Sequence, residues 1–278
     1  MLYVPDGTAP LIRRRFDAAR VRAALALTRF PDVRALLATT STNDDAAELL
    51  GDPQAAGLTL ITEIQTAGRG RKPGRRWIAP AGSALLFTTI LPVPVATDAL
   101  WAVPFWTALA VADGVEAGCG VRLDLRWPND LDLLGRKAGG ILCISRVTGG
   151  QAHVGCGIGL NVVRPPSDAL AGIEPPPAYL NDLRPHAGRE EILAGILGAM
   201  DGLLDVLGRP AEIARAWEER AQVNGRRYRV RLDADENVVE GTAIGLDREG
   251  GLILRESSGV RIVHLADARV LVAGGNLT

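Results

Sequence analysis

The chain has 278 residues, of which 47% are hydrophobic and 23% charged, a balance typical of a folded protein with one large domain or a large and a small one. Its 31 Lys and Arg residues against 32 Asp and Glu residues give a net charge of -1, which excludes a protein whose whole surface is dedicated to nucleic acid or an acidic membrane. The three cysteines form no close pair, which excludes a disulfide framework and predicts a reduced, cytoplasmic setting.

The sequence also contains no targeting or membrane-spanning signal. Pro5, Asp6 and Pro10 precede a run of three arginines, and such a segment lacks the apolar core of a secretory signal. The longest uncharged stretch, 77–97, is interrupted by glycine and proline, so no spanning helix is expected. Because the histidines and cysteines are scattered, no metal site built from these side chains is predicted.

The first part of the chain alternates short apolar segments with glycine and proline, a pattern that predicts a mixed sheet. A helix is expected to begin at Ser41-Thr42-Asn43, because these side chains can cap free backbone N–H groups. Asp44 and Asp45 then lie in its favourable first turn. A second helix is expected over 99–117. The expected strands cover residues 58–64, 84–91, 123–127, 139–147 and 152–163.

The second part begins after a proline-rich segment, 164–177, which is predicted to be an irregular loop. Apolar residues then recur at steps of three and four and predict a helix that ends at Gly208 and Pro210. From Asn224 onward, short alternating runs between Asp-, Glu- and Gly-containing turns predict a small β-barrel. The apolar stripe of the helix consists of Ile192, Ile196, Met200, Leu203 and Leu207.

A basic loop follows the first predicted strand, in a stretch without acids between Glu63 and Asp98. Its glycines allow backbone N–H groups to approach an anion, and its arginines can bind phosphate oxygens in pairs. The loop therefore predicts a phosphate-bearing ligand, although a solvated basic loop explains the charge equally well. Nucleic-acid binding is a weaker alternative, because Trp77 is the only aromatic neighbour. The residues of this loop are Gly68, Arg69, Gly70, Arg71, Lys72, Gly74, Arg75 and Arg76.

Two further segments attract attention, although neither is decisive alone. Gly155, Gly157 and Gly159 alternate along a predicted strand and leave one of its faces bare, either for a ligand or for close packing. They do not complete a dinucleotide-binding signature, and no P-loop sequence occurs. The segment 126–130 reads Arg-Trp-Pro-Asn-Asp, which is ordinary turn chemistry by itself, and Lys137 follows in a short hairpin.

Taken together and in this order, these segments closely resemble the biotin protein ligases. The resemblance covers roughly residues 36–163, and the stretch from Asn224 fits the family's C-terminal domain less distinctively. The matching motifs are Ser41-Thr42-Asn43, Gln65-Thr66-Ala67-Gly68-Arg69-Gly70-Arg71, Trp77, Trp127-Pro128-Asn129-Asp130, Lys137-Ala138-Gly139-Gly140-Ile141-Leu142 and Gly157-Ile158-Gly159-Leu160-Asn161-Val162.

The resemblance implies an α+β fold. A mixed, largely antiparallel sheet with helices packed on it, as in class II synthetases and biotin or lipoate ligases, is expected over 30–222, and a small SH3-like β-barrel over 223–278. Arg126 stands where the family more often has lysine, and Pro73 adds a residue to the basic loop. Only some forty residues precede Ser41, too few for the family's N-terminal DNA-binding domain, so repressor activity is not expected.

The activity implied by the resemblance has two steps. Biotin and ATP form biotinyl-5′-AMP with Mg²⁺, and biotin then passes to one lysine of a biotin carboxyl carrier protein of acetyl-CoA carboxylase. A lipoate or octanoate ligase or transferase is the nearest alternative, and a nucleic-acid-binding regulatory module is a more distant one. No DNA or membrane partner is expected, and exposed strand edges leave homodimerisation open.

The resemblance also implies roles for individual residues. The catalytic residues are Lys137, Arg71, Asp130 and Asn129. The biotin-binding residues are Ser41, Thr42, Asn43, Gln65, Gly68, Arg69, Lys137, Gly140 and Gly157. The residues that bind ATP or the adenylate are Arg69, Gly70, Arg71, Arg75, Trp77, Asn129, Lys137 and Asn161.

Overall fold

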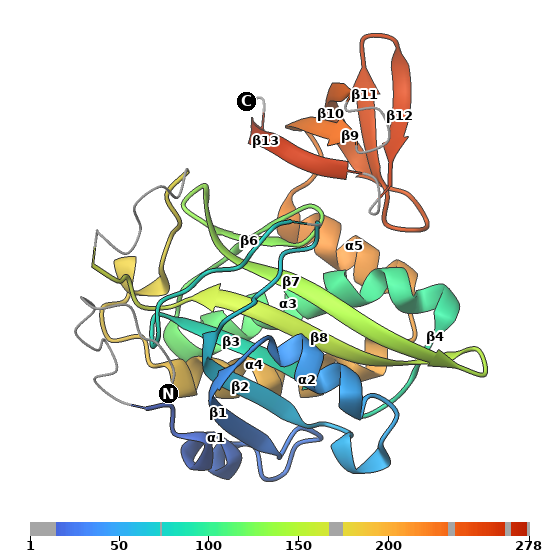
Figure 1. Cartoon of the computed structure of the whole chain (residues 1–278). Helices are drawn as coiled ribbons and strands as arrows, with labels where there is room; N and C mark the ends of the chain where they lie inside the picture. Colours follow the sequence, from blue (N-terminus) through green and yellow to red (C-terminus); the bar gives the residue numbers. More distant parts are fainter. Residues whose placement is uncertain (1–14, 73, 167–174, 233–236, 265–267, 277–278) are drawn as a thin grey trace.

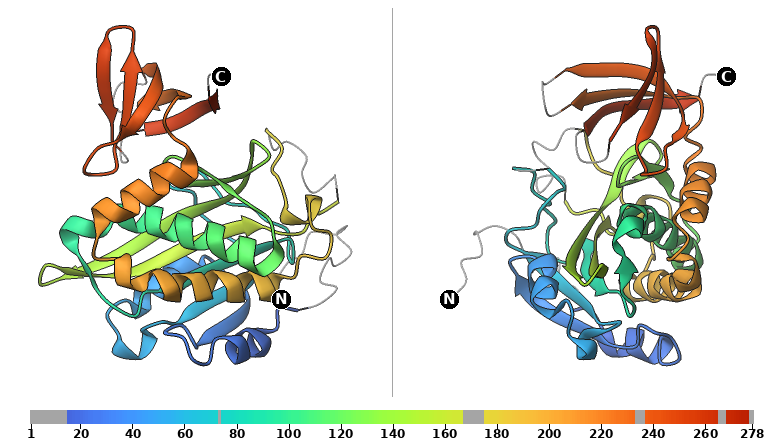
Figure 2. Two further views of the ribbon diagram at one scale, coloured as in Figure 1. Left: turned by 180° about the vertical axis from the view of Figure 1, so that it is seen from behind. Right: turned by 90° about the vertical axis from the view of Figure 1, so that its right-hand side faces the viewer.

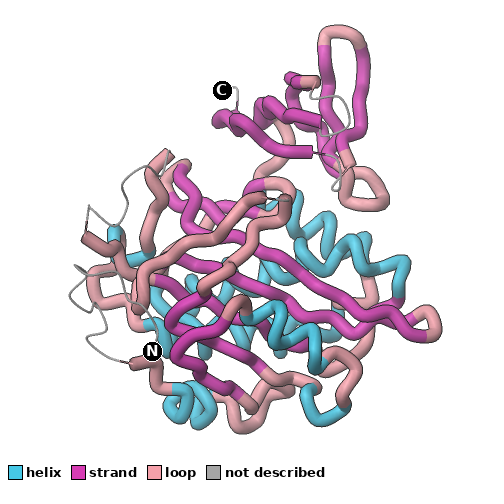
Figure 3. The backbone as a smooth tube through the Cα atoms, in the orientation of Figure 1, coloured by secondary structure: helices cyan, strands magenta, loops and turns pink. Residues whose placement is uncertain are grey.

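The computed structural model describes residues 15–72, 74–166, 175–232, 237–264 and 268–276 (Figure 1). A large mixed sheet forms the body, and a smaller antiparallel sheet stands at one end of it (Figure 3). Pro73 and the central part of the predicted proline-rich loop lie outside the described residues. Within these ranges, no helix combines the length and the apolar character needed to cross a membrane.

The large sheet has eight strands and is largely antiparallel, as predicted. Seven of them follow the order β1-β2-β3-β8-β7-β6-β5, and β4 pairs with β8 off this path. The β1–β2 pair is parallel and the other pairs are antiparallel. The strands are β1 (Val33–Thr39), β2 (Thr59–Gln65), β3 (Ala84–Ile90), β4 (Val95–Ala96), β5 (Asp124–Arg126), β6 (Asp130–Leu133), β7 (Arg136–Thr148) and β8 (Gln151–Asn161).

Helices cover both faces of this sheet. The helices α3, α4 and α5 lie on one face, as seen from behind in Figure 2, whereas α2 lies on the other. Gly114 of α3 meets Ile196 of α4 so closely that a Cβ atom on Gly114 would lie 2.2 Å from the Ile196 Cα atom. Glycine therefore permits this backbone approach. The helices are α1 (Ala18–Ala24), α2 (Thr42–Leu49), α3 (Val103–Cys119), α4 (Arg189–Leu203) and α5 (Pro210–Ala221).

Several elements differ from the sequence prediction. The helices α1 and α5 were not predicted, and Pro210 begins α5 rather than only ending the preceding helix, because a proline ring suits the first helical position. The helix expected from residue 99 begins at Val103, since residues 97–102 form a 3₁₀ segment. The strands β1, β4 and β6 were also missed; β1, for example, is an edge strand without alternating burial.

The C-terminal stretch, which was predicted to form a small SH3-like β-barrel, is a five-stranded antiparallel sheet. Its order is β12-β11-β10-β9-β13, with β13 closing against β9 although the sequence did not indicate that strand. Register shifts in β10 and β13 interrupt the pairing, and such irregularities bend a strand. The strands are β9 (Arg226–Leu232), β10 (Val238–Leu246), β11 (Leu252–Glu256), β12 (Gly259–Val263) and β13 (Ala268–Asn276).

The two units meet at Trp127, which is fully buried. Its indole Nε1 donates a hydrogen bond of 3.0 Å to the carbonyl oxygen of Gly250 in the β10–β11 turn. Gly250 has φ +79° and packs against Phe105 of α3. The segment that carries Asn129 and Asp130 is therefore directly attached to the C-terminal unit.

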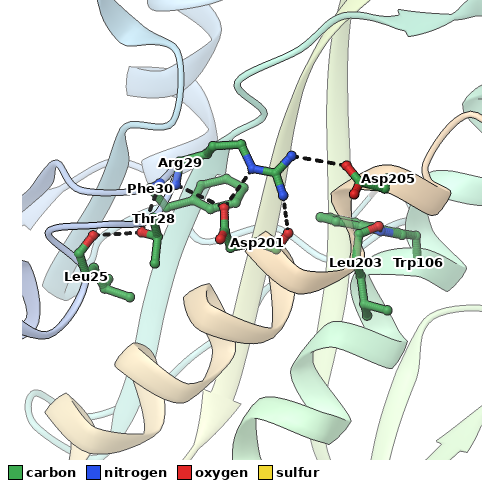
Figure 4. Close-up of polar contacts among 8 residues, drawn as sticks. All are labelled: Leu25, Thr28, Arg29, Phe30, Trp106, Asp201, Leu203 and Asp205. Carbon is green, nitrogen blue, oxygen red and sulfur yellow. Dashed lines mark hydrogen bonds and ion pairs between the residues drawn. The ribbon is translucent and has the colours of Figure 1, made fainter.

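Arg29 attaches the chain between α1 and β1 to the end of α4 (Figure 4). Its backbone N and its Nε donate to Asp201 Oδ1 at 2.9 and 2.8 Å, and its Nη1 donates to Asp205 at 3.3 Å. Trp106 Nε1 donates to the Leu203 carbonyl nearby, at 2.8 Å. These contacts hold the edge of the sheet against the helical layer.

A buried ion pair makes a second connection between strand and helix. Arg189, the first residue of α4, donates to both carboxylate oxygens of Glu63 in β2, at 2.6 and 2.9 Å. The backbone N of Phe16 donates to the same carboxylate at 2.8 Å. Because Glu63 is only 5% exposed, its negative charge depends on these donors.

We expect Arg189→Met to lower the free energy of unfolding by about 3–5 kcal/mol, because it leaves the Glu63 charge buried without a counter-charge. Urea unfolding followed by circular dichroism measures the change. Arg209→Met, which breaks the exposed Arg209–Glu212 pair, is the control and should cost less than about 1 kcal/mol. Equal losses in the two variants would contradict the prediction.

Candidate functional site

A cleft with a volume of about 70 Å³ opens on the face of the sheet that carries α2. It lies between the start of α2, the basic loop and the strands β3, β7 and β8. The predicted residues that line it are Ser41, Thr42, Asn43, Gln65, Arg69, Gly70, Arg71, Trp77, Asn129, Lys137, Gly140 and Gly157. The lining residues for which no role was predicted are Phe87, Ile141, Leu142, Ile158 and Gly159.

Hydrogen bonds organise the polar end of the cleft. Gln65 Oε1 accepts from the backbone N of Thr42 at 2.9 Å and from its hydroxyl at 3.3 Å. Thr88 Oγ1 forms hydrogen bonds with Thr42 Oγ1 at 2.8 Å and Asn43 Oδ1 at 2.7 Å, and Asn43 Nδ2 donates to the Leu142 carbonyl at 3.0 Å. Thr88 is fully buried within β3, and the sequence offered no signal for its role.

Ser41 and Thr42 do not cap α2 in the way the sequence suggested. Ser41 occupies the N-cap position, but its side chain makes no capping hydrogen bond. The free backbone N–H of Thr42 is satisfied by Gln65 from β2 instead. The start of α2 is thus bound to the neighbouring strand, and its polar side chains face the cleft.

The alternating glycines of β8 give space to two side chains of the site. A Cβ atom on Gly157 would lie 2.3 Å from Asn43 Oδ1, and one on Gly159 would lie 2.6 Å from Trp77 Cε2. Real Cβ atoms do not approach other atoms so closely. The bare face of β8 is therefore needed both for packing and for the cleft.

Trp77 occupies much of the space that this glycine face creates. Its ring lies against Gly159, and its Cζ3 atom is 3.6 Å from the Cβ position of Gly140. The indole Nε1 is buried and has no hydrogen-bond partner among the described residues. Trp77 thus presents an unused donor at the cleft.

Lys137 supplies a positive charge at the edge of the cleft. Its Nζ lies 2.5 Å from Asp130 Oδ1 and 5.9 Å from the centroid of the Trp77 ring. Asn129 is bound to β7, because its Nδ2 donates to the Ile141 carbonyl at 2.8 Å. Asp130 does not line the cleft but holds the Lys137 ammonium group, which does. Asn129 lies in the wall of the cleft.

The basic loop folds back on itself. The backbone N of Gly70 donates to the Arg75 carbonyl at 2.8 Å, and Arg69 pairs with Arg76 in an isolated β-bridge. The Arg69 guanidinium also binds Asp44 in the first turn of α2, with 3.2 Å between Nη1 and Oδ2. Asp44, which the sequence suggested only as a helix-start residue, thus positions a predicted ligand-binding arginine.

Four predicted site residues do not line the cleft. Gly68 packs against the Trp77 carbonyl and the Gln65 side chain, Arg75 is exposed, and Asp130 contacts Lys137 from outside the lining. Asn161 is only 6% exposed at the end of β8, and its Nδ2 donates to the Ala178 carbonyl at 3.2 Å. In this structure Asn161 therefore holds the chain segment that follows the proline-rich loop.

Asp132, two residues after Asp130, carries an unusual carboxyl group. Burial raises its pKa to about 6, although the Arg126 charge opposes this rise. Its Oδ2 pairs with Arg126, whereas its Oδ1 has no partner among the described residues. Arg126 is thus the counter-charge of a buried acid.

We expect Asp132 to make the protein less stable as pH rises from about 4 to 6. The folded state binds a proton that the unfolded state, with its ordinary pKa of 3.8, has already released, so the free energy of unfolding falls across this interval. The loss is at most about 3 kcal/mol. Urea unfolding across this pH range should show a flatter profile for Asp132→Asn, whereas exposed Asp98→Asn should follow the unmodified protein. Parallel profiles for Asp132→Asn and the unmodified protein would refute this.

Comparisons with known proteins agree with this geometry. Residues 36–161 match the biotin/lipoate A/B protein ligase family, and residues 225–269 match the biotin protein ligase C terminal domain. A biotin--[acetyl-CoA-carboxylase] ligase of Paracoccus denitrificans is 36% identical over 84% of this chain and 98% of that protein. One of Mycobacterium tuberculosis is 32% identical over 82% of this chain and 85% of that protein.

The fold is also shared with solved structures. A biotin protein ligase from Aquifex aeolicus in complex with biotin and ATP superposes with a TM-score of 0.68, at 23% identity, over 87% of this chain and 99% of that one. The two family matches of this chain and its sequence relatives together place it among the biotin protein ligases, which belong to the biotin/lipoate A/B protein ligase family.

Proposed function

We propose that this protein joins biotin to ATP, giving biotinyl-5′-AMP and pyrophosphate, and then transfers biotin to a lysine of a biotin carboxyl carrier protein. The single observation that carries the proposal is one cleft with a polar end, apolar walls and a cationic edge. Biotin has an apolar body with a polar ureido group at one end and a carboxylate at the other, so the cleft complements it. The names of the close relatives support the carrier of acetyl-CoA carboxylase as acceptor.

In the first step a biotin carboxylate oxygen bonds to the α-phosphorus of ATP, and the bond to the departing pyrophosphate breaks. Two anions must approach each other, so fixed positive charges lower the barrier. Lys137, Arg69 and Arg71 are the cations that line the cleft. The backbone N–H groups of the glycine-rich loop add donors for phosphate oxygens. We assign the biotin carboxylate to Lys137 and the phosphates to Arg71.

Mg²⁺ fits this site as an ion that is bound together with the nucleotide. Within the described ranges no three His, Cys, Asp or Glu side chains are grouped to hold a metal ion. Asp130 and Asn129 provide one carboxylate and one amide oxygen, which suits Mg²⁺ because it is held mainly by phosphates and water. When bound, Mg²⁺ neutralises phosphate charge.

In the second step the carrier lysine must reach the adenylate as a free amine. Asp130 or Asn129 can orient this amine, or they can hold the metal in the first step. An Asp130→Asn enzyme separates the two roles by its kinetics. Normal adenylate formation with slow transfer supports orientation of the amine, whereas failure to form adenylate supports a role in the first step.

The polar end of the cleft favours biotin over lipoate or octanoate. Gln65, Thr42 and Asn43 would bind the ureido group through the donor and acceptor positions that their contacts with one another, with Thr88 and with Leu142 leave over. An acyl chain without this group would offer those positions no partner, which disfavours the wrong ligand. The assignment of Ser41 to the same group rests on its position in the cleft lining.

ATP–pyrophosphate exchange with Mg²⁺ tests the proposal without the carrier. We expect exchange with biotin and none with lipoate or octanoate at equal concentration. Exchange only with lipoate or octanoate would overturn the substrate. Absence of all exchange, together with nucleic-acid binding that weakens with salt and needs no ATP, would favour a regulatory module instead.

We further propose that residues 30–222 form the catalytic domain and residues 223–278 the C-terminal domain, in the cytoplasm. The absence of DNA binding stays a prediction. The outer strands β1 and β5 flank the large sheet, and such edges can pair with a second copy. Size-exclusion chromatography with light scattering determines whether the protein forms a homodimer.

A further inference from the structure

Cys143 of β7 and Cys156 of β8 lie directly opposite each other in the large sheet. On β7, the backbone of Ile141 is turned away from β8, because it donates to the carbonyl of Asn129 and accepts from the Asn129 side chain. Backbone polar groups alternate in direction along a strand. Those of Cys143 therefore also point away from β8.

The partner strand gives the same result. The Val154 carbonyl accepts from Leu91 on the far side of β8, so the backbone of Val154 is turned away from β7. By the same alternation, the backbone of Cys156 is turned away from β7 as well. Cys143 and Cys156 are thus a non-hydrogen-bonded pair, the kind in which opposite Cα atoms are about 4.5 Å apart.

This spacing suits a disulfide, for which Cα separations of about 4.4–6.8 Å are usual. The Cys143 Sγ atom lies 3.9 Å from Thr107 Oγ1 of α3. Cys156 is fully buried, whereas Cys143 is partly exposed, so a reagent from solution would meet Cys143 first.

The dithiol lies on the α3 face of the sheet, directly behind the strand pair that borders the polar end of the cleft. The next pair along the two strands is Leu142 and Gly157. The Leu142 carbonyl accepts from Asn43 Nδ2, and Gly157 leaves no spare room beside Asn43. Any movement of the strands that brings the two sulfur atoms to bonding distance of about 2.05 Å is therefore passed to Asn43.

We propose that Cys143 and Cys156 form a redox-active dithiol whose oxidation to a cross-strand disulfide weakens ligand binding in the adjoining cleft. The inference rests on the proposed function for the identity of that ligand, biotin. The oxidant is a small-molecule disulfide such as glutathione disulfide. The thiolate of one of the two cysteines attacks it and releases one glutathione thiolate. The thiolate of the other cysteine then attacks the protein sulfur of this mixed disulfide and releases the second glutathione thiolate, so each cysteine has lost one proton.

The first experiment tests the chemistry alone. The native protein is treated with glutathione disulfide, its remaining thiols are alkylated, and its peptides are mapped by mass spectrometry. We expect a Cys143–Cys156 crosslink that dithiothreitol reverses, with Cys119 left outside it. Cys119 lies alone at the end of α3 and is the internal control. Absence of the crosslink, or a crosslink that forms only after denaturation, would overturn the proposal.

The second experiment tests the consequence for binding. Biotin affinity is measured by calorimetry before oxidation, after oxidation and after reduction with dithiothreitol. We expect oxidation to raise the Kd about tenfold, which corresponds to about 1.4 kcal/mol, and reduction to restore it. Cys143→Ala and Cys156→Ala should abolish the effect, and Cys119→Ser should retain it.

The outcomes separate this inference from the proposed function. A reduced protein that binds no biotin counts against the proposed function, while the crosslink still tests the dithiol. A crosslinked protein with the same biotin Kd as the reduced protein would overturn the coupling to the cleft. Because both readouts are also made on the unmodified chain, they do not depend on whether the variants fold.

Discussion

Replacement of Lys137 by alanine is expected to lower the rate of biotinyl-5′-AMP formation by about 10²- to 10³-fold, as is usual when a donor that stabilises developing charge is lost. Lys137 is the lysine of the cleft lining, and Asp130 holds its Nζ at 2.5 Å. Without it, the biotin carboxylate and the α-phosphate approach each other with less compensating charge. ATP–pyrophosphate exchange with biotin measures the effect.

Lys72 provides the control, because it is the other lysine of the chain. Lys72→Ala removes the same charge from the basic loop without removing a residue of the cleft lining, so its exchange rate should fall by less than about tenfold. Lys137→Arg keeps the positive charge but changes the shape of the charged group. Its exchange rate should lie between those of Lys137→Ala and Lys72→Ala. A Lys137→Ala enzyme with near-normal exchange would refute the assignment.

The second large effect is expected for Gly157→Ala, which should weaken biotin binding by about 100-fold. The new Cβ atom would lie 2.3 Å from Asn43 Oδ1 and 2.7 Å from the Leu142 carbonyl oxygen. Asn43 cannot move aside without losing its hydrogen bonds to Thr88 and Leu142. We also expect a loss of about 1–3 kcal/mol in the free energy of unfolding, as for other overpacked sites.

Calorimetry of biotin binding, together with urea unfolding, tests this expectation. Gly198→Ala is the matched control, because Gly198 lies in α4 with no atom within 4 Å of its Cβ position. It should leave biotin affinity unchanged and stabilise the helix by up to about 1 kcal/mol. Unchanged biotin affinity in Gly157→Ala would show that Asn43 is not part of the biotin site.

The sequence predicted the fold best where local pattern and burial agree. The strands β3 and β8 are long and apolar, and their positions were confirmed. The helix α4 was also confirmed, although it ends at Leu203 and a 3₁₀ segment, Leu204–Val206, follows where the prediction continued the helix to Gly208. The edge strand β1 and the two-residue β4 were missed because pairing, rather than pattern, makes them strands. The helix α5 was missed because a proline that ends one helix can also begin the next.

The order of residue types along the chain is enough to specify polar side chains at a helix start, a loop of arginine and glycine, and a lysine beside paired glycines. Which partners these residues take depends on the fold. Examples are Thr88 beneath Asn43, Asp44 on Arg69, and Cys143 opposite Cys156. Such partners lie far apart in the chain, and strand register brings them together, because a shift of one residue would turn each side chain to the other face of the sheet.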